Sequence, residues 1–393
     1  MGTTGDGKTK RIEEISMLKG LGMLYVITAH MACISGAIGL SESVMKLLTT
    51  LNIAVMVQFY MISGYTSRRK KGGALYVIRK RAIRIFIPYY IYSLIMIAVL
   101  AIVYLCIEGR SFAWFADGTL GILFQLQSFH HFDMSSTWMH PMFYSALPGW
   151  FQFQLFVSEL LFIPLLYLIK KNRKILKITL AFIFLLVGAL LYLMNLQGLN
   201  GQYFPTVCKI FIIPNIPGIA ALLLIGNFMA DHVMLDFDRY TARAKAVIAA
   251  VCFVITMIFA YTDDYIYDFP IGKWGAFGAY GYILAPLYGI SVMMLFGVIA
   301  NLIKRLEPVK KALILVGDNS MDYLMLHFFV GFLAAYIGRF WYNYLDNSVP
   351  TDNPGINILH FAILLVSSIA IPAIAIMLKK RLLKIIAGGD RNG

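Results

Sequence analysis

Long apolar runs alternate with short polar, basic segments along almost the whole chain. An α-helix needs about 20 mostly apolar residues to cross a hydrocarbon core of about 30 Å. Ten of the runs fit that requirement. The pattern therefore predicts an all-α integral membrane protein, a bundle of about ten transmembrane helices at residues 18–39, 44–66, 85–107, 150–169, 178–196, 210–230, 246–262, 276–303, 313–338 and 356–378.

The basic residues predict the orientation of these helices. If the N-terminus lies in the cytoplasm, 29 of the 34 lysines and arginines fall in cytoplasmic segments. Cytoplasmic loops are enriched in Lys and Arg, so this split favours ten spans with both termini cytoplasmic. The predicted organisation is a tail at 1–17, a membrane domain at 18–378 and a second tail at 379–393.

The composition indicates an integral membrane protein and argues against nucleic-acid binding. The chain is 60% hydrophobic and 14% charged, against about 25% charged in ordinary soluble domains. Its net charge of +14 lies in blocks between the apolar runs, which indicates contact with membrane lipids and no nucleic acid. The first run lacks a convincing cleavage site, so we expect no signal peptide. Four cysteines are scattered singly, without a metal-binding or redox spacing.

One predicted outer connection, 108–149, is much longer than the others. Its apolar middle, 120–126, is too short to span and could be re-entrant or interfacial. The loop also holds His130, His131, Asp133 and His140. No spacing among them matches a tetrahedral metal site, so a solvated loop is favoured over a metal site.

A lone histidine lies deep in the first apolar run. His30 follows Lys19 by eleven residues, or roughly 16 Å of helix, which is half of the hydrocarbon core. A titratable side chain at that depth is costly unless it faces a cavity or a partner, so His30 is a candidate functional residue. The alternative is a neutral histidine that bonds a neighbouring helix.

Two arginines open the third run. Arg81 and Arg84 are three residues apart, which on a helix places them on one face near the headgroups. The planar guanidinium suits bidentate phosphate contacts, and two of them would suit a nucleotide diphosphate. Attraction to anionic lipids is the simpler alternative.

Two more ionisable residues lie inside predicted spans. Glu159 is nine residues into the fourth span, where a carboxylate needs a partner or water; it could orient His30 or be protonated. His327 lies on a later helix that Asp318, Asn319 or Ser320 could cap. It is either a cavity residue or a packing histidine.

At these residues the chain resembles a known family. The segments KGLGMLYVITAH, FYMISGY and RKRAIRIFIP, in that order, are similar to the signature of acyltransferase family 3, within the transmembrane acyltransferase superfamily. PGWFQFQLFVSELLFIPLL and VGDNSMDYLMLHFF resemble two later segments of that family. Lys19 stands where the family often has arginine, and Met56 and Val57 replace a usual proline.

The resemblance implies a membrane O-acyltransferase, using acetyl-CoA as the expected acyl donor. The CoA phosphates would bind Arg81 and Arg84, helped by Lys19. His30 would act as general base for an acceptor hydroxyl, or as a transient acyl carrier. Glu159 and His327 would assist it. The acceptor would be a carbohydrate, surface glycan or lipid-linked sugar outside a bacterial cell membrane, and no metal is expected.

Two other functions stay open at this point. A transporter of small amino-acid-like molecules, from the same superfamily, would also need buried charges. A non-catalytic subunit of a polysaccharide assembly is the third alternative. A phosphate-binding arginine pair together with His30 favours the enzyme, because a transporter does not need such a pair at its cytoplasmic end.

Overall fold

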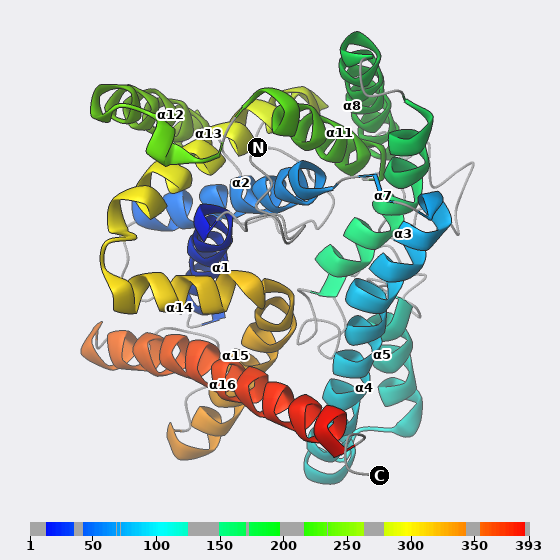
Figure 1. Ribbon diagram of the computed structural model, residues 1–393. Helices are drawn as coiled ribbons and strands as arrows, with labels where there is room; N and C mark the ends of the chain where they lie inside the picture. Colours follow the sequence, from blue (N-terminus) through cyan, green and yellow to red (C-terminus); the bar gives the residue numbers. More distant parts are fainter. Residues whose placement is uncertain are drawn as a thin grey trace.

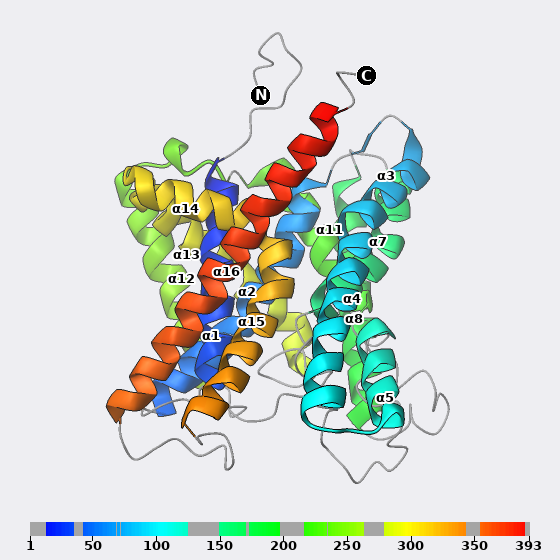
Figure 2. The same ribbon diagram turned by 90° about the horizontal axis from the view of Figure 1, so that it is seen from below.

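The fold is a bundle of long helices, most of which run between the same two ends of the molecule (Figures 1 and 2). The computed structural model describes residues 13–34, 42–67, 69–70, 72–124, 149–169, 173–196, 216–233, 235–262, 279–342 and 354–389. These residues contain no strand. The longer helices are α1 (Glu13–Ile34), α2 (Glu42–Thr66), α3 (Gly73–Arg81), α4 (Ile87–Ala101), α5 (Phe112–Phe124), α7 (Gly149–Leu168), α8 (Lys174–Leu196), α11 (Ile216–His232), α12 (Ala242–Thr262), α13 (Ala279–Ile303), α14 (Glu307–Asp318), α15 (Ser320–Tyr342) and α16 (Pro354–Gly389).

The prediction of an all-α membrane bundle is confirmed. Within the described part of the chain, eight stretches are long and apolar enough to cross a membrane. They lie in α1, in the continuous run from α3 through α4, and in α7, α8, α12, α13, α15 and α16. α2 and α11 occupy two further predicted positions, but α11 has 17 residues and α2 is outside the eight. The count of ten therefore stays a prediction.

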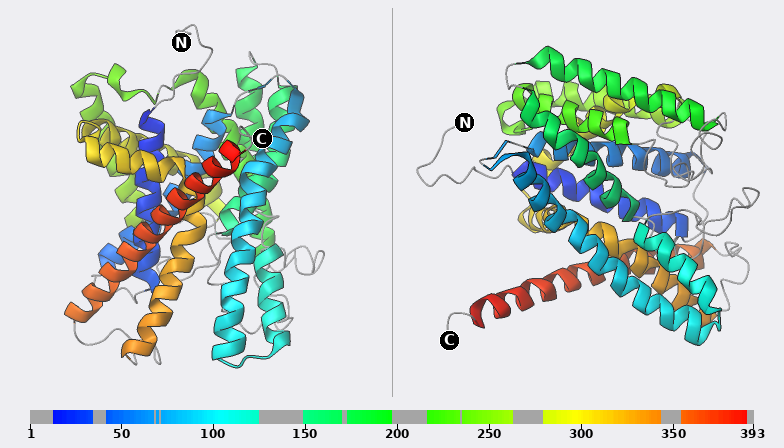
Figure 3. Two further views of the ribbon diagram at one scale, coloured as in Figure 1. Left: turned by 60° about the horizontal axis from the view of Figure 1, so that its bottom comes forward. Right: turned by 90° about the vertical axis from the view of Figure 1, so that its right-hand side faces the viewer.

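The start of α1 and the end of α16 lie at the same end of the bundle (Figure 2). This arrangement fits an even number of crossings, and we refer to that end as the inner end, following the predicted topology. α16 runs obliquely across the other helices (Figure 3) and continues to Gly389. The helix thus extends well into the segment 379–393 that the sequence assigned to a tail.

The predicted span 313–338 is wrong at its start, because two helices meet there. α14 is amphipathic: Leu313 and Val316 are buried, whereas Glu307 and Lys311 are exposed. It lies across the inner end of the bundle instead of spanning it (Figure 2). The break falls at Asn319, whose side-chain amide donates to the carbonyl of Leu315 at 2.6 Å, so it satisfies one of the carbonyls left open at the end of α14.

α5 fills part of the long connection at 108–149. It runs beside the outer half of α4 (Figure 2), and the hydroxyl of Tyr89 on α4 donates to the carbonyl of Ile122. Phe115 and Met96 belong to an apolar cluster that also includes Met325 and Phe329 of α15. His130, His131, Asp133 and His140 lie outside the described residues.

α1 is the most enclosed of the eight candidate spans. Two-thirds of its apolar window (67%) is buried, against 17% for α12 and 22% for α16. The peripheral helices instead present aliphatic side chains outward, as lipid-facing helices do. His30 therefore lies on a helix that is packed among α2, α13, α14, α15 and α16 (Figure 1).

Two glycines allow α2 and α11 to approach at the level of their backbones. A Cβ added to Gly64 of α2 would overlap the backbone of Leu223, and one added to Gly226 of α11 would overlap the backbone of Met61. Small residues permit this close contact, which is how membrane helices gain packing energy. The reciprocal contact fixes α2 against α11.

Substitution of Gly226 by alanine should therefore destabilise the bundle. The new methyl group meets a carbonyl that cannot rotate away, so overpacking should cost about 1–3 kcal/mol and lower the Tm measured in detergent. Gly22→Ala is the matched control, because the added Cβ there would meet side chains of Gln58, Val55 and Phe59, which can adjust. Equal Tm values for the two variants would contradict the backbone contact.

Candidate active site

Two histidines from helices far apart in the sequence face each other inside the bundle. Nδ1 of His30 on α1 lies 2.8 Å from Nε2 of His327 on α15. His327 is fully buried and His30 is 8% exposed. The two rings are nearly parallel, and Phe328 contacts the His30 ring edge-on, with centroids 5.2 Å apart.

The hydrogen bonds fix the tautomers of this pair. Nδ1 of His327 lies 2.8 Å from the backbone carbonyl of Tyr323, which can only accept. His327 Nδ1 therefore carries the proton, and in the neutral ring Nε2 is an acceptor. His30 must then donate from Nδ1–H to that Nε2. Neutral His30 thus keeps the lone pair on its own Nε2, which is the basic atom.

A second polar cluster lies where the inner end of α2 meets the middle of α7. Oε1 of Glu159 accepts from the hydroxyl of Ser63 at 3.0 Å and lies 3.5 Å from Nε of Arg81. Arg81 Nη2 also donates to Oγ of Ser67 at 3.0 Å. Glu159 is 1% exposed, and Arg81 and Ser63 supply the partners that its buried Oε1 requires. Its Oε2 has no hydrogen-bond partner within the described residues. These contacts join Glu159 to Arg81, and not to His30.

Arg81 and Arg84 do not share one face, contrary to the sequence interpretation. The residues Ala82–Phe86 form a π-helical segment (η1) between α3 and α4. A π turn holds more residues than an α turn, so two side chains three apart diverge. Arg81 is turned toward Glu159, whereas Arg84 is exposed. Arg84 is still near enough to Glu159 to interact with its charge.

Lys19 lies on α1, three turns before His30, and is half-buried. It lies next to Gly20, whose added Cβ would overlap the backbone of Leu313 on α14. The structure thus places Lys19 where α1 meets α14. It places Arg81 and Arg84, hereafter the arginine cluster, at the junction of α3 and η1 beside α7.

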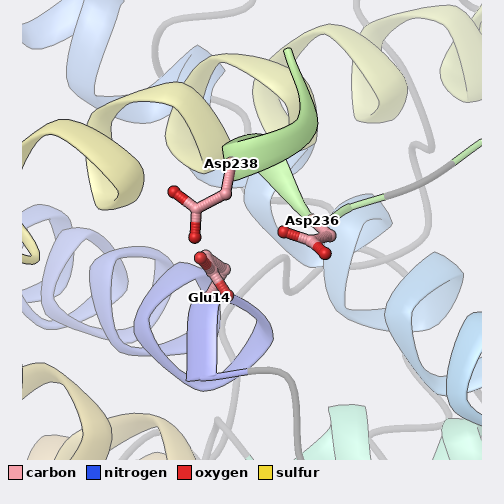
Figure 4. A group of neighbouring side chains, drawn as sticks. All are labelled: Glu14, Asp236 and Asp238. Carbon is pink, nitrogen blue, oxygen red and sulfur yellow. The ribbon is translucent and has the colours of Figure 1, made fainter. Parts of the chain in front are cut away.

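A third cluster is acidic. Glu14 of α1 lies beside Asp236, which precedes the short 3-10 turn η4 (Phe237–Arg239), and beside Asp238 within that turn (Figure 4). Their oxygens are close enough to hold a cation, but Lys304 Nζ lies 2.9 Å from Glu14 and 2.5 Å from Asp238. Hydrogen bonds from Lys304 and Asn301 hold the pKa of Asp238 below its ordinary value. Lys304 therefore balances part of the negative charge of the cluster, and Arg239 pairs with Asp236 at 3.0 Å.

A model of the acyltransferase domain matches residues 12–377, nearly the whole chain. The chain belongs to the acyltransferase 3 family. The eight candidate spans found in the described part of the chain make it a multi-pass membrane acyltransferase at the family level. Comparisons with curated proteins and with solved structures gave no match.

Sequence reasoning missed several buried polar residues of this acyltransferase. Gln152, Gln154 and Ser158 on α7 and Gln58 on α2 are at most 1% exposed. Each has a side-chain atom without a hydrogen-bond partner within the described residues: Gln152 Oε1, Gln154 Nε2, Ser158 Oγ and Gln58 Oε1. A signal was present, since polar residues inside a predicted span are uncommon and mark functional interiors.

Proposed function

We propose that this protein is an O-acyltransferase that moves an acyl group, an acetyl group in the first instance, from cytoplasmic acyl-CoA to a hydroxyl group outside a bacterial cell membrane. The acceptor class is a carbohydrate, a surface glycan or a lipid-linked sugar. The observation that carries the proposal is the tautomer of His30. It presents a basic Nε2 inside a membrane helix, and its Nδ1–H is held by His327.

The pair suits general-base catalysis. His30 Nε2 would take the proton of the acceptor hydroxyl as its oxygen attacks the thioester carbonyl. When the tetrahedral intermediate collapses, the carbon–sulfur bond breaks, and the protonated His30 returns the proton to the leaving thiolate. The products are an ester and free CoA. Imidazole is suited to both transfers because its ordinary pKa lies near neutral pH.

The arginine cluster is the proposed site for the CoA phosphates. Arg84 is exposed at the inner end, so its guanidinium is open to a phosphate from the cytoplasm. Arg81 is held by Ser67 and Glu159, so it would add a fixed positive charge beside the phosphate. Lys19 is a third candidate for contact with the donor.

The buried glutamines suit the remaining length of the donor. Gln154 lies five residues before Glu159 on α7, and Gln152 Nε2 donates to the carbonyl of Met321 at 2.9 Å. Met321 is six residues before His327 on α15, or roughly 9 Å of helix rise. The side-chain amides of Gln152 and Gln154 lie between Arg84 and His30 in this proposal. They would bond the two amides of the pantetheine arm, which would place the thioester beside His30.

Replacement of Arg84 should weaken donor binding. We expect Arg84→Ala to raise the Kd for [³H]acetyl-CoA about tenfold or more, and Arg84→Lys to raise it about threefold, because lysine keeps the charge but loses the bidentate fork. Equilibrium binding to the purified protein in lipid nanodiscs measures this without an acceptor. Arg79→Ala, an exposed arginine on α3, is the matched control. Equal affinities for all three variants would contradict a phosphate contact at Arg84.

Transfer itself can be measured with [¹⁴C]acetyl-CoA supplied to the cytoplasmic face of membrane vesicles. Radioactivity recovered as an ester on the carbohydrate fraction is the expected result. Uptake of a labelled amino acid without consumption of acetyl-CoA would favour a transporter instead.

A further inference from the structure

A buried lysine lies at the inner end of α8, close to the arginine cluster. Lys177 is 5% exposed, although Lys174 and Ile175 in the same turn are exposed. A lysine at the end of a membrane helix normally extends its amine to the headgroups. Burial of the ammonium is costly unless hydrogen-bonded partners compensate. The inward direction of Lys177 therefore calls for an explanation.

The partners of Lys177 lie on α11. Its Nζ donates to Oδ1 of Asn227 at 2.9 Å and lies 3.4 Å from Oδ2 of Asp231, one turn further along. An ammonium can only donate, so the contact fixes which end of the Asn227 amide is the oxygen. The amide nitrogen must then point the other way.

That nitrogen bonds the end of α2. Asn227 Nδ2 lies 3.0 Å from the backbone carbonyl of Ser67 and 3.5 Å from that of Gly64. The last carbonyls of a helix have no partner within it, so the contact stabilises the end of α2 in one position. Asn227 is 4% exposed, so water does not replace it easily.

Ser67 connects Asn227 to Arg81. Its hydroxyl donates to the carbonyl of Ser63 at 2.7 Å, and it accepts the hydrogen bond from Arg81 Nη2. A chain of hydrogen bonds thus runs from α8 through α11 and α2 to α3. We propose that Lys177 and Asn227 are positioning residues that set the place of the Arg81 guanidinium for binding of the donor phosphates.

The role of Arg81 in donor binding rests on the proposed function, but the hydrogen-bonded link from Lys177 to Arg81 does not. The first test therefore avoids the ligand. Lys177 and Arg81 bond different partners, so the effects of Lys177→Met and Arg81→Gln on the Tm should add if the residues are independent. If the proposed link exists, the Tm of the double variant should fall by clearly less than the sum of the decreases in the two single variants. The control is the cycle of Lys304→Met with Arg81→Gln, because Lys304 belongs to the separate acidic cluster. The two effects on the Tm should add in that cycle. An additive Lys177 cycle would overturn the link.

The second test is equilibrium binding of [³H]acetyl-CoA. Lys177→Met should raise the Kd about tenfold, which is the order expected from losing one charge-assisted hydrogen bond, and Lys177→Arg should restore most of the affinity. Lys304→Met should leave the Kd within about twofold of the wild type. If the wild-type protein does not bind acetyl-CoA, the proposed donor is wrong, and the stability cycle alone decides the link.

Asn227→Asp is a second variant, in case Lys177→Met fails to fold. The aspartate keeps an oxygen for Lys177 but cannot donate to the Ser67 carbonyl. We expect a lower Tm, because a carboxylate oxygen then faces that carbonyl, and a Kd for acetyl-CoA about tenfold higher in the protein that folds. An unchanged Kd in a folded Asn227→Asp variant would overturn the proposal.

Discussion

Replacement of His30 by alanine should abolish acyl transfer and leave acetyl-CoA binding within about twofold of the wild type. General-base catalysis contributes about 10²–10⁴-fold to a rate, and no second base lies beside His30 in the described structure except His327, whose Nδ1–H is committed to Tyr323. The measurement pairs [¹⁴C]acetyl transfer in membrane vesicles with [³H]acetyl-CoA binding to the purified variant.

The matched control for this experiment is His360→Ala. His360 is a half-buried histidine on α16, outside the proposed site. That variant should transfer acetyl groups at a rate close to that of the wild type. If His30→Ala retained transfer at an equal protein level in the membrane, His30 would have no part in the chemistry.

The sequence predicted the spanning helices well where length and apolar character decide the outcome. α12 and α13 are examples, since each forms within a long apolar run. It was wrong where the helix is amphipathic: α14 has charged residues on one side, so its end was merged into the span of α15. Hydropathy averages over a window and does not detect a break at a single residue such as Asn319.

The candidate site shows the same limit at the level of side chains. His30 and His327 were both singled out, but residues 297 positions apart offer no spacing from which to predict a pair. The shared face of Arg81 and Arg84 was predicted from an α-helix, and the π segment η1 separates them. Glu159 was a candidate partner of His30, yet Arg81 and Ser63 supply its contacts. Only tertiary structure decides such partners.

The hydrogen bond from His30 to His327 should orient the His30 ring, and this effect can be measured separately from the loss of the base. Because Tyr323 holds the proton on His327 Nδ1, His327 Nε2 can accept from His30 and keep it in one tautomer. Loss of that acceptor would let the His30 proton occupy either nitrogen and let the ring rotate. Correct orientation of a catalytic imidazole by a hydrogen-bond acceptor is worth up to about 10⁴-fold in enzymes with a catalytic triad.

His327→Leu should therefore lower the rate of [¹⁴C]acetyl transfer about 10²-fold or more at saturating acetyl-CoA, without changing the Kd for acetyl-CoA. His327→Gln should lose only about tenfold, because its side-chain oxygen can accept from His30 Nδ1–H. The order of the two variants is the decisive result. A histidine that only packs is surrounded by membrane helices, so leucine would replace it at least as well as glutamine. Leucine more active than glutamine would therefore contradict the positioning of His30 by His327.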